Sequence, residues 1–459
     1  MMGESEGQVR RDDSEHVFHS WSAQRDLNSL PIEGAAGCFF WDYQGHRYLD
    51  FASQLVYANL GHQHPALLDA IKKQAATLCT VGPSFANAAR GELARLIAER
   101  APGDLNHVFF TNGGTEANEH AIRMARLHTG RVKVLSAYRS YHGATAASIA
   151  ATGEPRRWGS EPGMPGIVHF LGPYRYRSSF GAQTDEQEAH LALAHLRQVL
   201  EFEGPQSVAA ILLETVVGTN GVLVPPAGYL AGVRQLCDEF GIVMICDEVM
   251  VGFGRIGEWF AVQAWGVVPD LITFAKGVNS GYVPLGGVVI SERIRATFMD
   301  RPYPGGLTYS GHPLACAVGV ASIRFFEHTD LLAHVREMGE TVVGPALEQI
   351  AARHPSVGEV RGRGLMWAVE LVRDRDTKEM MVPFNASGQE NQPMARLALR
   401  CRELGVWPFT HFNRLHIAPP LVISRTELQQ GLEAVDQALL VADAYCSKSG
   451  VRTAEPIFV

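Results

Sequence analysis

Apolar residues between about residues 85 and 330 fall into short continuous runs that alternate with amphipathic stretches. The continuous runs predict buried strands at residues 132–135, 208–213, 242–246, 271–274 and 287–290. A helix is predicted to begin at Phe85, and one face of it carries four apolar residues at helical spacing: Ala89, Leu93, Leu96 and Ile97. Strands that are apolar throughout are typical of a largely parallel sheet covered by helices on both faces. The expected fold class is α/β, with its chemistry at the carboxyl ends of the strands.

The pattern changes toward both ends of the chain. The first residues are polar and of mixed charge, and we assign them no structure. Short strands around a turn are predicted at residues 38–51, and strands and helices alternate again after residue 330. The predicted division is a flexible N-terminal arm at 1–15, an N-terminal segment joining the small domain at 16–64, a large domain at 65–330 and a smaller α+β domain at 331–459. Residues 374–393 are polar and predict a surface loop.

Composition and charge narrow the class of protein. A length of 459 residues exceeds what one hydrophobic core usually supports, in agreement with two domains. The formal net charge of −8 provides no basic surface for nucleic acid, so we expect no such partner. The seven cysteines are scattered and are interpreted as buried thiols in a reducing compartment. No apolar run has the length of a membrane span, and the N-terminus does not resemble a signal peptide, so the expected location is cytoplasmic and no membrane partner is expected.

An acid and a lysine follow two of the predicted strands. Asp247 comes directly after the strand at 242–246, and Lys276 follows the strand at 271–274. Carboxyl ends of parallel strands meet at one edge of a sheet, so both side chains can face one ligand. A lysine there suits Schiff-base formation, and a carboxylate suits the ring nitrogen of a pyridine cofactor. The same two residues would also fit a buried salt bridge, and taken alone they leave both interpretations open.

A second segment suits the binding of phosphate. Thr111-Asn112-Gly113-Gly114-Thr115 lies between a predicted strand and a predicted helix, and a helix N-terminus offers free N–H groups to an anion. Thr115 could equally be an ordinary N-cap. Tyr141, in Tyr141-His142-Gly143, could pack on one face of a planar cofactor and Val249 on the other, although core packing also explains Tyr141. His62 and His64 lie in a turn without nearby acids, so no metal is expected.

Taken together, these segments resemble the class III aminotransferases, the ω-transaminase group of fold-type I pyridoxal-phosphate enzymes. The resemblance covers nearly the whole chain after the arm. The matching segments, in order, are residues 57–62, residues 112–118, Tyr141-His142-Gly143, Glu214, Asp247-Glu248-Val249, residues 252–255, Lys276-Gly277, residues 308–313 and residues 361–364. An ordered set of this kind is far more specific than any one motif.

The resemblance implies a role for each matching residue. Lys276 would bond pyridoxal 5′-phosphate as a Schiff base, and Asp247 would pair with its ring nitrogen. The remaining cofactor contacts implied are Gly114 and Thr115 at the phosphate, Tyr141 and Val249 on the two faces of the ring, His142 beside Tyr141, Glu214 near the cofactor and its aspartate, and Thr308 from a neighbouring subunit. The last contact implies a homodimer with shared sites, and a tetramer of two such dimers is the alternative. The family often has Ser where this chain has Gly113, which puts one hydroxyl contact in doubt.

The resemblance also implies a reaction and a substrate class. We expect ping-pong transfer of an amino group from an amine or ω-amino acid to a keto acid or aldehyde. Residues 275–287 look most like the taurine, β-alanine or amine to pyruvate branch, so pyruvate is the expected acceptor. Arg414 falls where the family commonly has a mobile arginine for the acceptor carboxylate, although a surface arginine opening a strand is the other interpretation. The candidate walls of the substrate pocket, which could also be ordinary core, are Tyr57, Phe85, Leu55 and Trp21.

Three other functions fit the same residues less well. An aminomutase or a dialkyl amino-acid decarboxylase would use the same fold and cofactor but transfer little nitrogen to pyruvate. A regulator that binds the cofactor without turnover is the least expected, because Lys276 and the whole set of anchoring residues are present.

Overall fold

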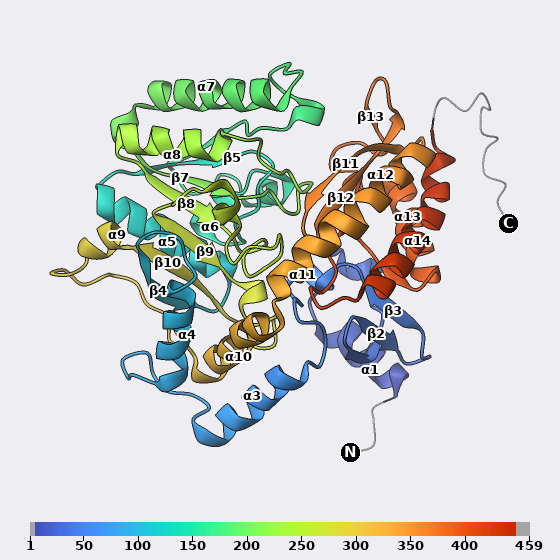
Figure 1. The fold of residues 1–459 in the computed structure, drawn as a ribbon, viewed down its shortest axis with the longest axis horizontal. Helices are drawn as coiled ribbons and strands as arrows, with labels where there is room; N and C mark the ends of the chain where they lie inside the picture. The colour runs from blue at the N-terminus through green and yellow to red at the C-terminus, as the bar shows by residue number, and fades with distance from the viewer. Residues whose placement is uncertain (1–4, 447–459) are drawn as a thin grey trace.

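A computed structural model describes residues 5–446 of the chain. It contains a seven-stranded sheet, a five-stranded sheet and a four-stranded sheet, with helices packed around them (Figure 1). The strands of the large sheet, in spatial order, are β4 (Leu105–Thr111), β10 (Gly286–Ser291), β9 (Leu271–Phe274), β8 (Val243–Asp247), β7 (Val208–Glu214), β5 (Lys133–Ala137) and β6 (Ile167–Phe170). The strands from β9 to β6 are parallel, whereas β10 runs antiparallel to both β9 and β4.

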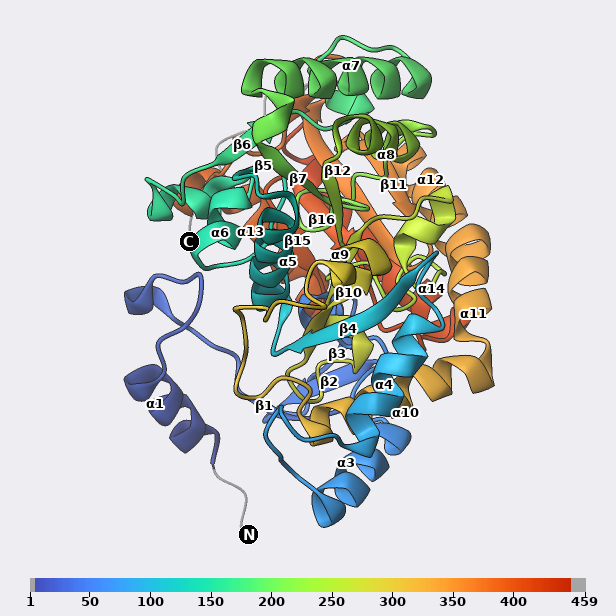
Figure 2. The same ribbon diagram turned by 90° about the vertical axis from the view of Figure 1, so that its left-hand side faces the viewer.

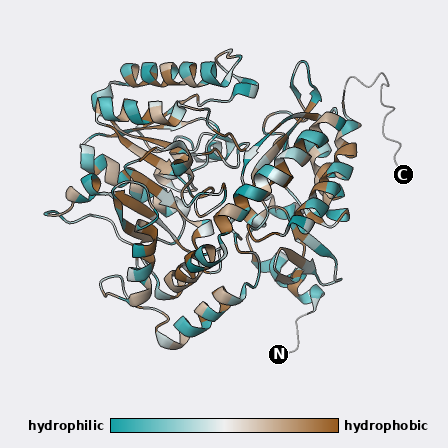
Figure 3. Cartoon of the chain, viewed as in Figure 1, coloured by the Kyte–Doolittle hydropathy of each residue, from teal (hydrophilic) through white to brown (hydrophobic). Residues whose placement is uncertain are grey.

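Helices cover both faces of the large sheet, because its strands are apolar throughout. In β7, Ile211 packs into one cluster, whereas its neighbours Ala210 and Leu212 pack into another on the opposite face. The helices of the first cluster are α4 (Ala88–Ala98), α7 (Asp185–Glu203), α8 (Tyr229–Phe240) and α10 (Pro313–Thr329). Those of the second are α5 (Gly114–Thr129), α6 (Ala146–Ala151) and α9 (Glu292–Ala296). Figure 3 shows the hydrophobic residues concentrated in these central strands.

The C-terminal part of the chain forms its own sheet and core. Its strands are β11 (Val357–Arg363), β12 (Met366–Asp374), β16 (Arg414–Ile417) and β15 (Phe409–His411), with β13 (Glu379–Met380) paired to β12. Its helices are α11 (Leu331–Met338), α12 (Gly344–Arg353), α13 (Gln392–Glu403) and α14 (Arg425–Asp443). A π-helical turn, Gly339–Val343, separates α11 from α12, and in it Gly339 lies against the backbone of Gly364. The expected boundary at residue 330 falls between α10 and α11.

The N-terminal strands belong to the same side of the molecule as the C-terminal sheet. In the four-stranded sheet, β1 (Ile32–Ala36), β2 (Phe39–Asp42) and β3 (Arg47–Asp50) are followed by β14 (Val406–Trp407), which pairs with β3 in parallel. Phe51 also packs into the C-terminal core, where α14 passes. A short distorted helix, α2 (Ser53–Val56), and α3 (Pro65–Thr77) then lead into the large sheet.

Two expectations are corrected by the structure. The arm was expected to have no structure, but residues 6–16 form a helix, α1 (Glu6–His16), at the edge of the molecule (Figure 2). Ser5 caps it and Glu6 pairs with Arg10 one turn later, whereas none of its residues is buried, so the apolar pattern gave no sign of it. The thiols were expected to be buried, but Cys79 is exposed and Cys446 is half-buried. No helix among residues 5–446 is long and apolar enough to cross a membrane.

Candidate active site

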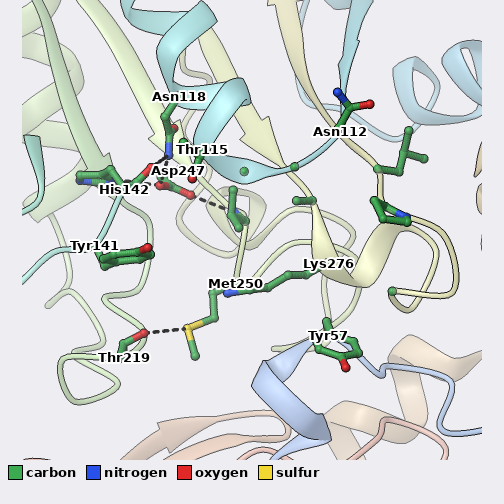
Figure 4. Close-up of a pocket in the computed structure, with 18 of the residues that line it drawn as sticks. Tyr57, Asn112, Thr115, Asn118, Tyr141, His142, Thr219, Asp247, Met250 and Lys276 are labelled. Atoms are coloured by element: carbon green, nitrogen blue, oxygen red, sulfur yellow. Dashed lines mark hydrogen bonds and ion pairs between the residues drawn. The ribbon is translucent and has the colours of Figure 1, made fainter. Parts of the chain in front are cut away.

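A cavity of about 330 Å³ opens where four neighbouring strands of the large sheet end. Tyr141 follows β5, Glu214 ends β7, Asp247 ends β8 and Lys276 follows β9. Glu214 and Asp247 lie opposite each other in the register of β7 and β8. Other lining residues are Tyr57, Asn112, Gly114, Thr115, Asn118, His142, Val249 and Met250. In Figure 4, Asp247, His142 and Asn118 lie together on one side of the cavity, and Lys276 reaches toward it from the segment after β9.

Asp247 is held by three donors on three different segments. Its Oδ2 accepts hydrogen bonds of 2.7 Å from Asn118 Nδ2 and of 2.7 Å from His142 Nδ1, and its Oδ1 accepts one of 3.0 Å from the backbone N–H of Val249. Asn118 is itself fixed, because its Oδ1 accepts a hydrogen bond from Thr273. The carboxylate is therefore pre-oriented, as electrostatic stabilisation of a bound group requires.

The environment of Lys276 lowers the pKa of its amine, which favours the reactive neutral form. Burial lowers the pKa of its side chain, and the charges of Arg156 and Arg255 lower it further, whereas Asp247 and Glu214 oppose this shift. A lower pKa leaves the amine neutral more often, and only a neutral amine attacks a carbonyl. The φ of Lys276 is +47°, a conformation uncommon for any residue other than glycine. Such strain is characteristic of functional sites.

The side chain of Glu214, which lines the cavity, has a pKa far above its ordinary value. Burial raises its pKa to about 7, and the charge of Asp247 contributes, although His142 and two backbone N–H groups oppose the shift. Those N–H groups belong to Tyr141 and Gly218, which donate to Oε1 and Oε2 at 2.9 and 2.7 Å. Glu214 thus fixes two loops that line the cavity.

The N-terminus of α5 lies at the same cavity. Gly114 and Thr115 open this helix, and the preceding Gly113 is extended, with a φ of −177°. The first N–H groups of a helix have no partner within it, so they remain available to an anion. A Cβ on Gly114 would lie 2.7 Å from Val249 Cγ1, which explains why this position has no side chain.

These residues fit pyridoxal phosphate at each of its parts. The helix N-terminus suits the phosphate, the held carboxylate suits the ring nitrogen, and the buried lysine suits the aldehyde. Val249, beside Gly114, and Tyr141 line the same cavity and suit the two faces of the ring. A buried salt bridge between Asp247 and Lys276, the alternative interpretation, does not form in the part of the chain that the structure describes, where Asp247 pairs with His142 and also accepts from Asn118 and Val249.

Sequence reasoning missed Arg156, which lies in the turn Pro155–Ser160 after α6. Its guanidinium carbon lies 3.8 Å from the centroid of the Tyr141 ring. Its Nη2 is buried and has no hydrogen-bond partner among residues 5–446. Arg156 does not line the cavity itself, and no local motif marks it, because only the position of its turn brings it to Tyr141.

Four predicted residues are not part of the cavity of one chain. Trp21, Leu55 and Phe85 were interpreted as pocket walls or core, but their exposed fractions are 68%, 48% and 63%. Thr308 is also exposed, so its predicted contact with a neighbouring subunit stays a prediction. Among the proposed walls, Tyr57 does line the cavity.

Arg414 is neither at the surface nor in the cavity. It is 2% exposed at the start of β16, and its Nη1 donates to the backbone oxygen of Asn220. The interpretation as a surface arginine is therefore wrong. Asn220 follows Thr219, which lines the cavity, so Arg414 lies behind that loop. Its role toward an acceptor carboxylate stays a prediction.

Comparison with known proteins agrees with this geometry. The family described as aminotransferase class-III matches residues 21–439. The putrescine–pyruvate aminotransferase of Pseudomonas aeruginosa is 34% identical over 437 residues, covering 92% of this chain and 93% of that protein. The taurine–pyruvate aminotransferase of Bilophila wadsworthia is 30% identical over 451 residues, covering 94% and 96%.

A solved structure extends the similarity to three dimensions. The taurine:2-oxoglutarate aminotransferase of Bifidobacterium kashiwanohense, in complex with pyridoxal phosphate and glutamate, is 44% identical, with a TM-score of 0.93 over 96% of this chain and 99% of that one. An (S)-enantioselective ω-transaminase from Thermomicrobium roseum is 37% identical, with a TM-score of 0.90 over 96% and 99%. The chain therefore belongs to the class III aminotransferases, and it is a pyridoxal-phosphate-dependent transaminase of fold type I.

Proposed function

We propose that this transaminase moves the amino group of an ω-amino acid or amine to a keto acid, preferably pyruvate. The observation that carries the proposal is the convergence of Lys276, Asp247 and the N-terminus of α5 on one cavity. The names of relatives that use putrescine or taurine as donor and pyruvate as acceptor support this substrate class.

Each residue of the site has a separate role in the proposed reaction. Pyridoxal phosphate, when bound, withdraws electrons from the donor carbon. Lys276 would hold the cofactor through its amine, and the same amine would take the proton from the donor carbon and return it. Asp247 would keep the ring nitrogen protonated, and His142 and Asn118 hold that carboxylate in place. Gly114 and Thr115 would bind the phosphate through the helix N-terminus.

Two arginines are candidates for the anionic group of a substrate. Arg156 lies over Tyr141 with a nitrogen that has no partner in the part of the chain that the structure describes, which suits the sulfonate or carboxylate at the far end of an ω-amino acid. Arg414 stays the candidate for the acceptor carboxylate, and it would have to release Asn220 to reach the cavity. An unchanged Michaelis constant for pyruvate in Arg414→Ala would remove Arg414 from this role.

We further propose a homodimer in which Thr308 of each chain completes the site of the other. The exposure of Thr308, Trp21, Leu55 and Phe85 in one chain supports this arrangement, because a second chain would cover them. Sedimentation would test it, and a monomer with full activity would refute it. A cytoplasmic location is also proposed, supported by seven cysteines of which none forms a disulfide.

One spectroscopic experiment tests the reaction. The purified protein is supplied with pyridoxal phosphate, and its visible absorbance is followed as taurine, β-alanine, a diamine and 1-phenylethylamine are added separately, with pyruvate afterwards. We expect at least one donor to bleach the visible band and pyruvate to restore it. A band that no donor bleaches would indicate a regulator without turnover. Conversion of a donor without any transfer to pyruvate would indicate an aminomutase or a decarboxylase.

A further inference from the structure

Glu154 is a buried acid beside the cavity that is not among the residues lining it. It lies between α6 and the turn Pro155–Ser160, and only 1% of its side chain is exposed. Its Oε1 accepts a hydrogen bond from Nε of Arg156, and its Oε2 lies 3.7 Å from Nε2 of His411. A buried carboxylate is stable only where opposite charges or donors surround it, so Glu154 requires these two neighbours.

The contact with Glu154 restricts how Arg156 can point. The Nε edge of the guanidinium faces the carboxylate, and the ring of Tyr141 lies 3.8 Å from its central carbon. A planar guanidinium held along one edge and on one face has little freedom left. Two nitrogens remain, Nη1 and Nη2, and Nη2 is buried and has no acceptor among the described residues. A buried N–H without an acceptor is unfavourable, and a bound anion would remove that cost.

His411, a residue of the C-terminal sheet, lies near the same carboxylate. It ends β15 and packs against Phe412 with a ring distance of 4.0 Å. Burial by itself would raise the pKa of Glu154, but His411 and Arg156 lower it, so the carboxylate is charged. Glu154 therefore connects an arginine of the large domain to a histidine of the C-terminal sheet.

We propose that Glu154 is a positioning residue that, with His411, holds Arg156 against Tyr141 so that the guanidinium binds the anionic end of the substrate. This deepens the proposed function, on which it rests, because it assigns the selection of anionic donors to a buried pair outside the cavity. Glu154 touches neither substrate nor cofactor, and its effect passes through Arg156.

Kinetics of Glu154→Gln with two kinds of donor test the proposal. With taurine or β-alanine we expect KM to rise roughly tenfold, the size of one lost charge-assisted contact, at nearly unchanged kcat. With 1-phenylethylamine, which has no anionic group, we expect KM to change less than about twofold. Glu161→Gln is the matched control, since Glu161 pairs with the neighbouring Arg157 at the surface and should affect neither donor.

A binding measurement separates this proposal from the proposed function. Ethanesulfonate has the anionic end of taurine without its amine, and its affinity for the enzyme loaded with cofactor is measured by calorimetry. We expect binding roughly tenfold weaker in Glu154→Gln and an intermediate loss in Glu154→Asp, which keeps the charge. If Glu154→Gln does not fold, Glu154→Asp and His411→Phe carry the comparison.

The outcomes are distinct. Equal loss with anionic and neutral donors, or unchanged affinity for ethanesulfonate, would overturn the role of Glu154 even if the enzyme is an active transaminase. Ethanesulfonate binding that depends on Glu154, in a protein that transfers no amino group from any donor, would support the subsite and refute the proposed function. Absence of ethanesulfonate binding to the unaltered enzyme would overturn the subsite as well.

Discussion

At the scale of single residues, the site is organised around the charge of Asp247. Asn118 and His142 donate to one of its oxygens and Val249 to the other, so an uncharged replacement keeps the shape but loses the charge. We expect Asp247→Asn to lower kcat by about 100-fold or more, in the range seen when an electrostatic contact to the reacting system is removed. The cofactor content should stay high, because the phosphate site is separate. Single-turnover absorbance with a donor would measure this, and a kcat within twofold of the original would contradict it.

Glu214 makes the stability of the folded chain depend on pH. Its pKa in the folded chain, raised by burial to about 7, lies above the ordinary value of 4.5. The fold thus favours the protonated acid, so the contribution of Glu214 to stability is complete below pH 4.5 and is lost as the pH rises through about 7. The loss amounts to about 3 kcal/mol.

The variant Glu214→Gln removes this titration. Relative to it, we expect the original protein without cofactor to lose stability between about pH 4.5 and about pH 7, as followed by urea unfolding at a series of pH values. The slope is diagnostic, because the glutamine amide also disturbs the contacts with Tyr141 and Gly218 and shifts all values together. Parallel curves for the two proteins would show that Glu214 does not titrate in this range.

At the scale of elements, the start of α5 decides how the phosphate is held. A Cβ at Gly114 would lie 2.7 and 2.8 Å from the two Cγ atoms of Val249, whereas a Cβ at Gly113 would meet nothing within 4 Å. We expect Gly114→Ala to displace the helix from Val249 and to weaken binding of pyridoxal phosphate about tenfold or more. Gly113→Ala, at an extended position, should bind nearly as well as the original. Fluorescence titration with cofactor measures both, and equal affinities would contradict the argument.

Elements with strong apolar patterns were predictable from the sequence. The strands ending at Asp247 and before Lys276 were found within a residue of their observed bounds, because they are buried on both faces. The direction of β10 was not, since an antiparallel strand in the middle of a sheet is as apolar as its parallel neighbours. Nor was α1, which buries nothing. Arg156 was missed for a different reason, because its proposed role depends on a partner, Tyr141, fifteen positions away in a neighbouring turn.

At the scale of the whole molecule, Glu370 joins the two large sheets. It lies on β12, and it accepts hydrogen bonds from Tyr174 and Arg177, which follow β6 of the large sheet. Arg361 on β11 donates to Glu370 at 2.7 Å and also to the backbone oxygen of Gly221, in the loop after β7. Burial alone would raise the pKa of Glu370, but the neighbouring arginines lower it to about 2, so the acid is charged across the useful pH range.

Removing that charge leaves Arg177 without its acid at the junction of the sheets and leaves Arg361 with Glu359 alone. We expect Glu370→Gln to lower the free energy of unfolding by about 3–5 kcal/mol at neutral pH, the usual cost of breaking a buried ion pair from one side. Glu239→Gln is the control, because Glu239 forms a pair with Arg197 at the surface, and its unfolding curve should hardly change.

Urea unfolding, followed separately by circular dichroism and by the absorbance of bound cofactor, distinguishes loss of the junction from loss of the fold. If the junction fails first, the cofactor signal disappears at lower urea than the helical signal, because the loop that contains Gly221 also donates to Glu214 through the N–H of Gly218. Coincident transitions at the original midpoint would show that the network at Glu370 does not stabilise the molecule.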